Sequence, residues 1–251
     1  MIDFHPIPVG TGVPCRCVRC GASPEVSYAS VAAIEARLAG VHATACGARG
    51  DTAAGPGCGV ALTGPEPFAH PELPALVAAC RRAGFSRVAV ETDGAALASH
   101  DNAAGVLHAG VRHLWVRVLG ADDAAHDGLT GRPGRGAASR LGVATYLEAA
   151  AATGVTVAVT AVVPVCRHTL GDLSAIVAAC ARRGFHAVRL ETAGPVPSQS
   201  APVIAAACDT GMVNRTWVST DGMLPLPDTH RLHGAPDGGP VALEPEGGDA
   251  R

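Results

Sequence analysis

Three cysteines lie within six residues near the start of the sequence, at Cys15, Cys17 and Cys20. Thiolates that converge in this way are ligands for zinc and for iron–sulfur clusters. The chain has nine cysteines, an odd number, and its first residues lack a basic stretch followed by an apolar one. We therefore expect a cytoplasmic protein whose clustered cysteines bind a metal rather than form disulfides.

The spacing of this cluster leaves several ligand sets open. We expect joint ligation by Cys15 and Cys17, which are only two positions apart, to need a turned loop. Nearby glycines and Pro14 favour such a turn. Cys46 or Cys58 is an alternative third thiolate, and a zinc site or the absence of any metal are alternatives to an iron–sulfur cluster.

A carboxylate follows the first strongly apolar run of the sequence. Residues 58–62 form a short strand pattern, which leads into Thr63-Gly64-Pro65-Glu66-Pro67 and then into a helix start at 68–76. Proline removes only a backbone donor, so this turn keeps its carbonyl oxygens as acceptors. The Glu66 carboxylate is suited to pairing with an ammonium group.

Polar residues also end the next strand patterns. Residues 87–91 are followed by Thr92 and Asp93, and residues 113–119 include Arg117. Parallel strands end at one edge of a sheet, so we expect Thr92 and Asp93 near Glu66, whereas the pattern leaves Arg117 equally compatible with the outer face. Residues 132–136, Arg-Pro-Gly-Arg-Gly, are typical either of an anion-binding loop or of a solvated turn.

The strand, the turn around Glu66 and the following helix resemble the strand, Gly-Gly-Glu-Pro turn and helix of the radical S-adenosylmethionine (radical SAM) enzymes. The Thr92-Asp93-Gly94 sequence is similar to the family's Thr-Asn-Gly, and the resemblance extends from the first cysteines to Pro195. Pro65 replaces the second glycine of the family turn. Val13 stands where the family's Cys-x3-Cys-x2-Cys motif has its first cysteine, and Arg19 stands where it has an aromatic residue.

The resemblance implies a [4Fe–4S] cluster held by Cys15, Cys17 and Cys20, with SAM as the second cofactor. It implies that SAM is cleaved reductively to a 5′-deoxyadenosyl radical, which abstracts hydrogen from a peptide, a natural-product precursor or another small molecule. An external donor such as a flavodoxin or ferredoxin would supply the electron. The implied SAM-binding residues are Gly64, Pro65, Glu66 and Pro67 at the methionine part, Thr92, Asp93 and Arg117 near its carboxylate or ribose, and the region of Val162 and Val163 at adenine.

Helix and strand patterns alternate along the chain and position these groups. The helix, glycine and strand of residues 76–94 recur at 176–194, which favours repeated α-then-β units and parallel strands. We expect an α/β fold with roughly six strands, a partial (β/α)6 TIM-like barrel with outer helices. Residues 1–195 would form this core and residues 196–251 an extension with a disordered end. The expected helices lie near 27–38, 73–83, 100–109, 138–153, 169–183 and 201–210, and a further strand near 215–219.

Composition limits the function classes. The 251 residues carry 19 basic and 22 acidic side chains, which gives no positive surface for nucleic acid or an anionic membrane, and no lysine is present for Schiff-base chemistry. No apolar run is long enough to span a membrane. Two alternatives to a radical enzyme remain: a degenerate barrel that serves as a binding or partner subunit, and a barrel enzyme with a zinc site.

Overall fold

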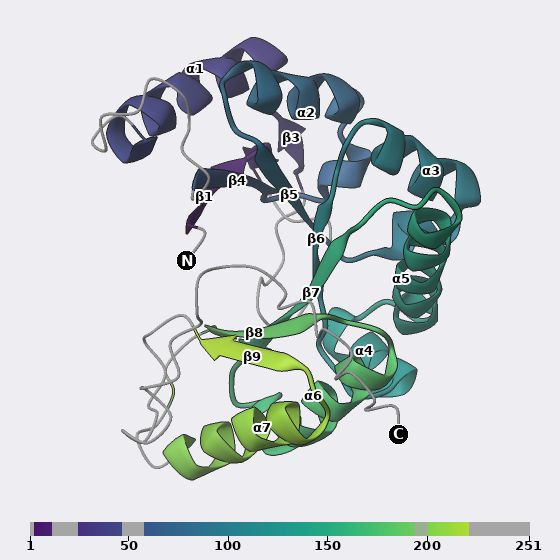
Figure 1. The fold of residues 1–251 in the computed structure, drawn as a ribbon. Coiled ribbons are helices and arrows are strands. Elements are labelled where there is room, and N and C mark those ends of the chain that lie inside the picture. The colour runs from purple at the N-terminus through teal and green to yellow at the C-terminus, as the bar shows by residue number, and fades with distance from the viewer. Residues whose placement is uncertain (1–2, 12–24, 47–57, 194–195, 197–199, 221–251) are drawn as a thin grey trace, which may run out of the picture.

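Seven parallel strands form one curved sheet in the computed structural model, which describes residues 3–11, 25–46, 58–193, 196 and 200–220. The α/β fold and the partial barrel predicted from the sequence are confirmed, and a seventh strand joins the roughly six expected (Figure 1). In sheet order the strands are β1 (Asp3–Pro8), β4 (Cys58–Thr63), β5 (Arg87–Thr92), β6 (His113–Arg117), β7 (Ala158–Val165), β8 (Ala187–Thr192) and β9 (Trp217–Thr220).

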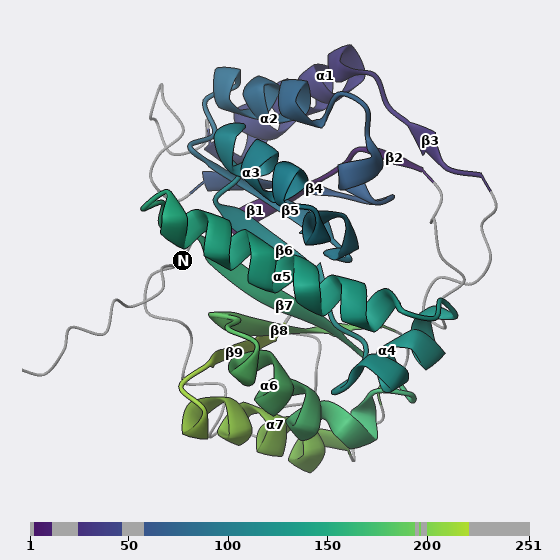
Figure 2. The same cartoon turned by 90° about the vertical axis from the view of Figure 1, so that its right-hand side faces the viewer.

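Helices cover the convex face of this sheet (Figure 2). Their buried sides follow the apolar spacing of the sequence: in α2 it places Leu76, Val77 and Cys80 against the strands. Burial raises the pKa of the Cys80 thiol to about 12, as expected for a core residue. The helices are α1 (Val31–Val41), α2 (Leu73–Arg82), α3 (His100–His108), α4 (Asp123–Thr130), α5 (Arg135–Ala152), α6 (Leu173–Arg182) and α7 (Ala201–Val213).

Side chains that meet across the concave face show how strongly the sheet curls. Phe4 on β1 and Trp115 on β6 are three strand spacings apart in the sheet, which is about 14 Å along a flat surface. Their ring centroids are 5.3 Å apart in an edge-to-face arrangement. Gly59 leaves room for this contact, because a Cβ at that position would lie 2.8 Å from the Phe4 ring. The concave face is therefore the inner wall of a half-barrel.

One segment differs from the sequence-based expectation. Residues 123–130 form α4, a helix that is not among those expected from the sequence. The Asp122 side chain accepts a hydrogen bond from the amide of Ala125 at 2.8 Å and caps the helix start. Gly131 ends the helix in the left-handed region, with φ of 66°. Local capping thus turns the acidic segment into a helix.

The segment after residue 195 contributes to the sheet where it is described. Helix α7 leads to β9, which pairs in parallel with β8. The predicted disordered end falls in residues 221–251, outside the described part of the chain. Within the described residues, no helix combines the length and apolar character that a membrane crossing demands.

Candidate functional site

The turn after β4 is built around a glycine and a buried glutamate. Gly64 has φ of 101°, a conformation that side-chain-bearing residues rarely adopt. Pro65, Glu66 and Pro67 are buried, and the Glu66 carboxylate accepts a hydrogen bond from the amide of Phe68 at 3.3 Å. This contact caps the short 3-10 helix Pro67–Ala69 and holds the carboxylate at the carboxyl end of the sheet.

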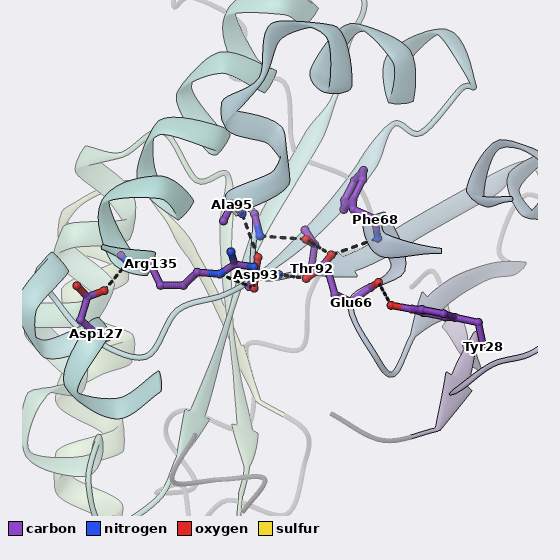
Figure 3. Close-up of polar contacts among 10 residues, drawn as sticks. Tyr28, Glu66, Phe68, Thr92, Asp93, Ala95, Asp127 and Arg135 are labelled. Carbon is purple, nitrogen blue, oxygen red and sulfur yellow. Dashed lines mark hydrogen bonds and ion pairs between the residues drawn. The ribbon is translucent and has the colours of Figure 1, made fainter. Parts of the chain in front are cut away.

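The neighbouring strand β5 supplies the other partners of Glu66. Oε1 accepts a hydrogen bond from the Thr92 hydroxyl at 2.6 Å, and Oε2 accepts one from the backbone amide of Asp93 at 2.9 Å (Figure 3). The Thr92 hydroxyl in turn accepts from the amide of Gly94 at 3.0 Å. Three residues predicted from the ends of adjacent strands therefore form one hydrogen-bonded group.

The electrostatics of this group favour a positive ligand. Burial raises the pKa of Glu66, the negative charge of Asp93 raises it further, and the positive charge of Arg117 and the hydrogen bonds act in the opposite direction. Glu66 is only 6 % exposed. A cation placed beside these carboxylates would offset the cost of burying an ionised Glu66, so the residues fit an ammonium group.

An arginine that the sequence reasoning did not select completes the group. The Nε of Arg135 donates to Oδ2 of Asp93 at 2.8 Å, and a terminal nitrogen donates to the same oxygen. The other oxygen of Asp93 accepts from the amide of Ala95 at 3.0 Å (Figure 3). Asp93 is thus fixed from two sides, by α5 and by its own loop.

The glycine-rich loop before α5 binds an anion from within the chain. The amides of Gly134 and Gly136 donate to the two oxygens of Asp127 at 2.5 and 2.7 Å. The bond from Gly136 contributes most to lowering the pKa of Asp127. Residues 132–134 are exposed, as in a solvated turn, and the amides of this loop bind an aspartate of α4. This contact holds the backbone on both sides of Arg135.

A short antiparallel ladder, formed by residues on either side of 12–24, contacts the same turn. Strand β2 (Gly10–Thr11) pairs with β3 (Ser27–Tyr28) in an antiparallel ladder. The Tyr28 hydroxyl donates to the carbonyl oxygen of Glu66 at 3.1 Å. The amide of Val9 donates to the carbonyl of Thr63 at 2.9 Å. The described residues on both sides of residues 12–24 therefore lie beside the Glu66 turn.

The three cysteines predicted as metal ligands and their two alternatives differ in whether the structure describes them. Cys15, Cys17 and Cys20 fall in residues 12–24, outside that part of the chain. The alternative ligand Cys58 begins β4, about 17 Å along the strand from Thr63, at the opposite edge of the sheet. The other alternative, Cys46, is the last residue of the π-helix His42–Cys46. The ring of His42 contacts the ring of Phe85, which precedes β5, so this π-helix also begins at the amino edge of the sheet. Neither alternative lies close to Glu66. Within the described residues, no group of three potential metal ligands is found.

The remaining predicted residues lie on different faces of the sheet. Arg117 is half-buried on the concave face, where its Nε is 3.5 Å from a Glu91 carboxylate oxygen. Val162 pairs in register with Arg117 and shares its face. Val163 is fully buried in the hydrophobic core on the helix side. Strand alternation thus directs Val162, rather than Val163, toward the interior of the half-barrel.

Comparisons with known proteins identify the fold. No protein-family model matches the sequence, and no curated protein matches it either. Among solved structures, Streptococcus suis SuiB bound to its precursor peptide SuiA is similar over 88% of this chain and 50% of SuiB, with a TM-score of 0.61 and 12% identity. anSMEcpe with bound AdoMet and a peptide is similar over 87% of this chain and 63% of that protein, with a TM-score of 0.60 and 13% identity. Archaeal TYW1 is similar over 80% of this chain and 69% of TYW1, with a TM-score of 0.52 and 13% identity.

These structures are radical SAM enzymes, and this chain has their fold. The resemblance inferred from the turn around Glu66 is thereby confirmed at the level of the fold. The chain spans about half the length of SuiB.

Proposed function

We propose that this chain is the core of a radical SAM enzyme, with SAM bound at the Glu66 turn. The observation that carries the proposal is a buried carboxylate, held by Thr92 and Asp93 at the carboxyl edge of a half-barrel of the radical SAM fold. Structures of SuiB and anSMEcpe contain SAM, which supports the same ligand here.

The residues of the turn have separate roles in this proposal. Glu66 and the carbonyl oxygens of Gly64 and Pro65 receive the methionyl ammonium of SAM. Pro65 costs the turn one amide donor, but it keeps its carbonyl, so it is compatible with an ammonium ligand. Pro67 starts the short helix that orients the Glu66 side chain.

The polar residues of β5 and β6 surround the rest of the ligand. Thr92 and Asp93 orient Glu66, and Asp93, Arg117 and Arg135 supply charges near the SAM carboxylate or ribose. Arg135 pairs with the Asp93 carboxylate and partly offsets the negative charge that acts on Glu66. Adenine lies near Val162 and Val163 on β7, with Val162 on the concave side.

Cys15, Cys17 and Cys20 hold a [4Fe–4S] cluster in this proposal. When bound, such a cluster supplies the electron for the reductive cleavage of SAM that generates the hydrogen-abstracting radical. The ladder of β2 and β3 supports this ligand set, because it places the described residues that flank the cysteines beside the turn. The contribution of the protein is to orient the ligands and keep water away from them.

The half-barrel leaves its concave face for the substrate, and we propose that the substrate is a peptide. SuiB has been solved with its precursor peptide and anSMEcpe with peptides, and both share the fold. A flavodoxin or ferredoxin is the proposed electron donor.

Anaerobic reconstitution tests this function. We expect about four irons per chain and 5′-deoxyadenosine formation with dithionite and SAM. Cys17→Ser should lose both, whereas Cys208→Ser on α7 should keep both. Bound zinc in protein purified without oxygen would instead support the zinc enzyme, and a chain without metal would support the scaffold subunit.

A further inference from the structure

Charged side chains line the concave face at positions where a closed barrel would carry packed apolar residues. Alternation along the strands directs Glu91, Arg117, Arg189 and Glu191 to this face, whereas Val116, Val188 and Leu190 between them are buried on the helix side. The charged residues lie toward the carboxyl ends of β5, β6 and β8. They therefore line the space next to the proposed SAM site.

Arg189 on this face is held through only part of its guanidinium group. The Nε of Arg189 is 3.1 Å from a carboxylate oxygen of Glu191, and its Cζ lies 5.1 Å from the centroid of the Trp115 ring. Among the described residues, no acceptor bonds its two terminal nitrogens. The side chain is 36% exposed. Arg189 is thus held in place while its two remaining donor groups stay accessible.

The Trp115 ring gives this arrangement its rigidity. A guanidinium that lies over an indole is attracted to the ring face. Trp115 is itself held edge-to-face by Phe4 from across the half-barrel. Glu191 holds the guanidinium of Arg189 at its Nε, and the Trp115 ring holds the plane of the group. The side chain therefore loses less conformational freedom when a ligand binds the two terminal nitrogens.

We propose that Arg189 binds a carboxylate of the substrate, so that the substrate is an acid. This inference rests on the proposed function, because it places the substrate on the concave face. The planar donors of arginine match the two oxygens of a carboxylate. The neighbouring Glu91 and Glu191 disfavour a doubly charged phosphate, which they would repel more strongly than a monoanion. The carboxylate belongs to an acidic residue or terminus of a peptide, or to a small free acid.

The test uses the emission of Trp115 in the full chain. The sequence has two tryptophans, so Trp217→Phe makes Trp115 the single reporter. The probes are N-acetyl-glutamate N′-methylamide and its glutamine counterpart, and propionate and propionamide. We expect the glutamate probe to bind at least tenfold more tightly than the glutamine probe. A comparable preference for propionate over propionamide would identify the ligand as a small free acid. Absence of that preference would identify it as an acidic group of a peptide.

Variants separate Arg189 from general effects of charge. Arg189→Gln should abolish the preference for the acid, and Arg189→Lys should reduce it. Arg82→Gln should retain it, because Arg82 makes a similar pair with Glu35 on the outer surface. The double variant Arg189→Gln with Glu191→Gln removes both members of the ion pair and should also lose the preference.

The inference would be overturned if the acid and amide probes bound with equal affinity, or if neither acid bound. It would also be overturned if the preference for the acid survived in Arg189→Gln. SAM affinity of the reconstituted protein is measured in parallel. We expect Arg189→Gln to leave it unchanged. Absence of SAM binding in the unmodified chain would instead count against the proposed function. Failure of the Arg189 inference can therefore be distinguished from failure of the proposed function.

Discussion

Replacing the Glu66 carboxylate by an amide tests the site most sharply. Glu66→Gln keeps the size of the side chain and removes the charge that would pair with the methionyl ammonium. Oε2 can still accept from the Asp93 amide, a rotated Thr92 hydroxyl can accept from the new amide group, and only the longer bond from the Phe68 amide, at 3.3 Å, loses its acceptor. The folded site should therefore survive, while the charged interaction is lost.

The size of the expected effect follows from that interaction. A hydrogen bond to a charged group contributes roughly 1.5–3 kcal/mol. Each 1.4 kcal/mol corresponds to about a tenfold change in affinity, so the SAM dissociation constant should rise about 10- to 100-fold. Isothermal titration calorimetry on the reconstituted protein measures this change.

Glu72→Gln is the matched control, because Glu72 lies exposed at the start of α2, six positions from Glu66. It should leave SAM affinity within about twofold of the unmodified chain, since an exposed charge outside the site contributes little. Wild-type affinity in Glu66→Gln would refute the role given to this carboxylate.

The same variant should change the pH dependence of stability in the ligand-free protein. The pKa of Glu66 is raised in the folded state, chiefly by burial. The folded state therefore binds the proton more tightly, and stability falls as pH rises from the unfolded pKa through the folded one. Glu66→Gln should lack this loss, so its melting temperature relative to the unmodified chain should increase across that window. A difference in melting temperature between the two proteins that does not change with pH would contradict the raised pKa of Glu66.

Two further predictions concern the packing that supports the site. Thr92→Val removes the donor to Glu66 and the acceptor for Gly94 in a fully buried position, and should cost roughly 1–3 kcal/mol in urea unfolding, whereas Thr92→Ser should cost about 1 kcal/mol or less. Gly142→Ala should destabilise by about 3 kcal/mol or more, because its Cβ would lie 2.0 Å from the carbonyl oxygen of Gly94. Gly105→Ala, in an open position on α3, should instead stabilise by up to about 1 kcal/mol, and similar effects of the two alanines would count against this packing.

The sequence was sufficient to predict which strand ends form the centre of the site. Glu66 follows one strand, and Thr92 and Asp93 end the next along the chain, so a parallel sheet brings them together without further information. The repeated helix and strand units likewise predicted that β5 and β8 are parallel strands, each preceded by a helix. Alternation along β7 could have separated Val162 from Val163, because Thr160 shares the face of Val162, but the rest of the run is apolar on both faces and the signal is weak.

The contacts that complete the site could not be derived in this way. Arg135 is 42 residues from its partner Asp93 and starts a helix rather than ending a strand. Tyr28 reaches the turn through a two-residue ladder that is too short to produce a strand pattern. Helix α4 is not among the expected helices, although it carries a local signal, because Asp122 and Gly131 are typical capping residues.

The central claim is that the clustered thiolates and the Glu66 turn serve one metal-bound ligand. Electron paramagnetic resonance of the reduced, reconstituted protein, recorded with and without SAM, tests it directly. The account predicts a single [4Fe–4S]⁺ signal whose g-values shift when SAM is added to the unmodified chain, with a much weaker shift at the same SAM concentration in Glu66→Gln. A cluster signal that SAM leaves unchanged, or a protein that binds no cluster at all, would contradict it.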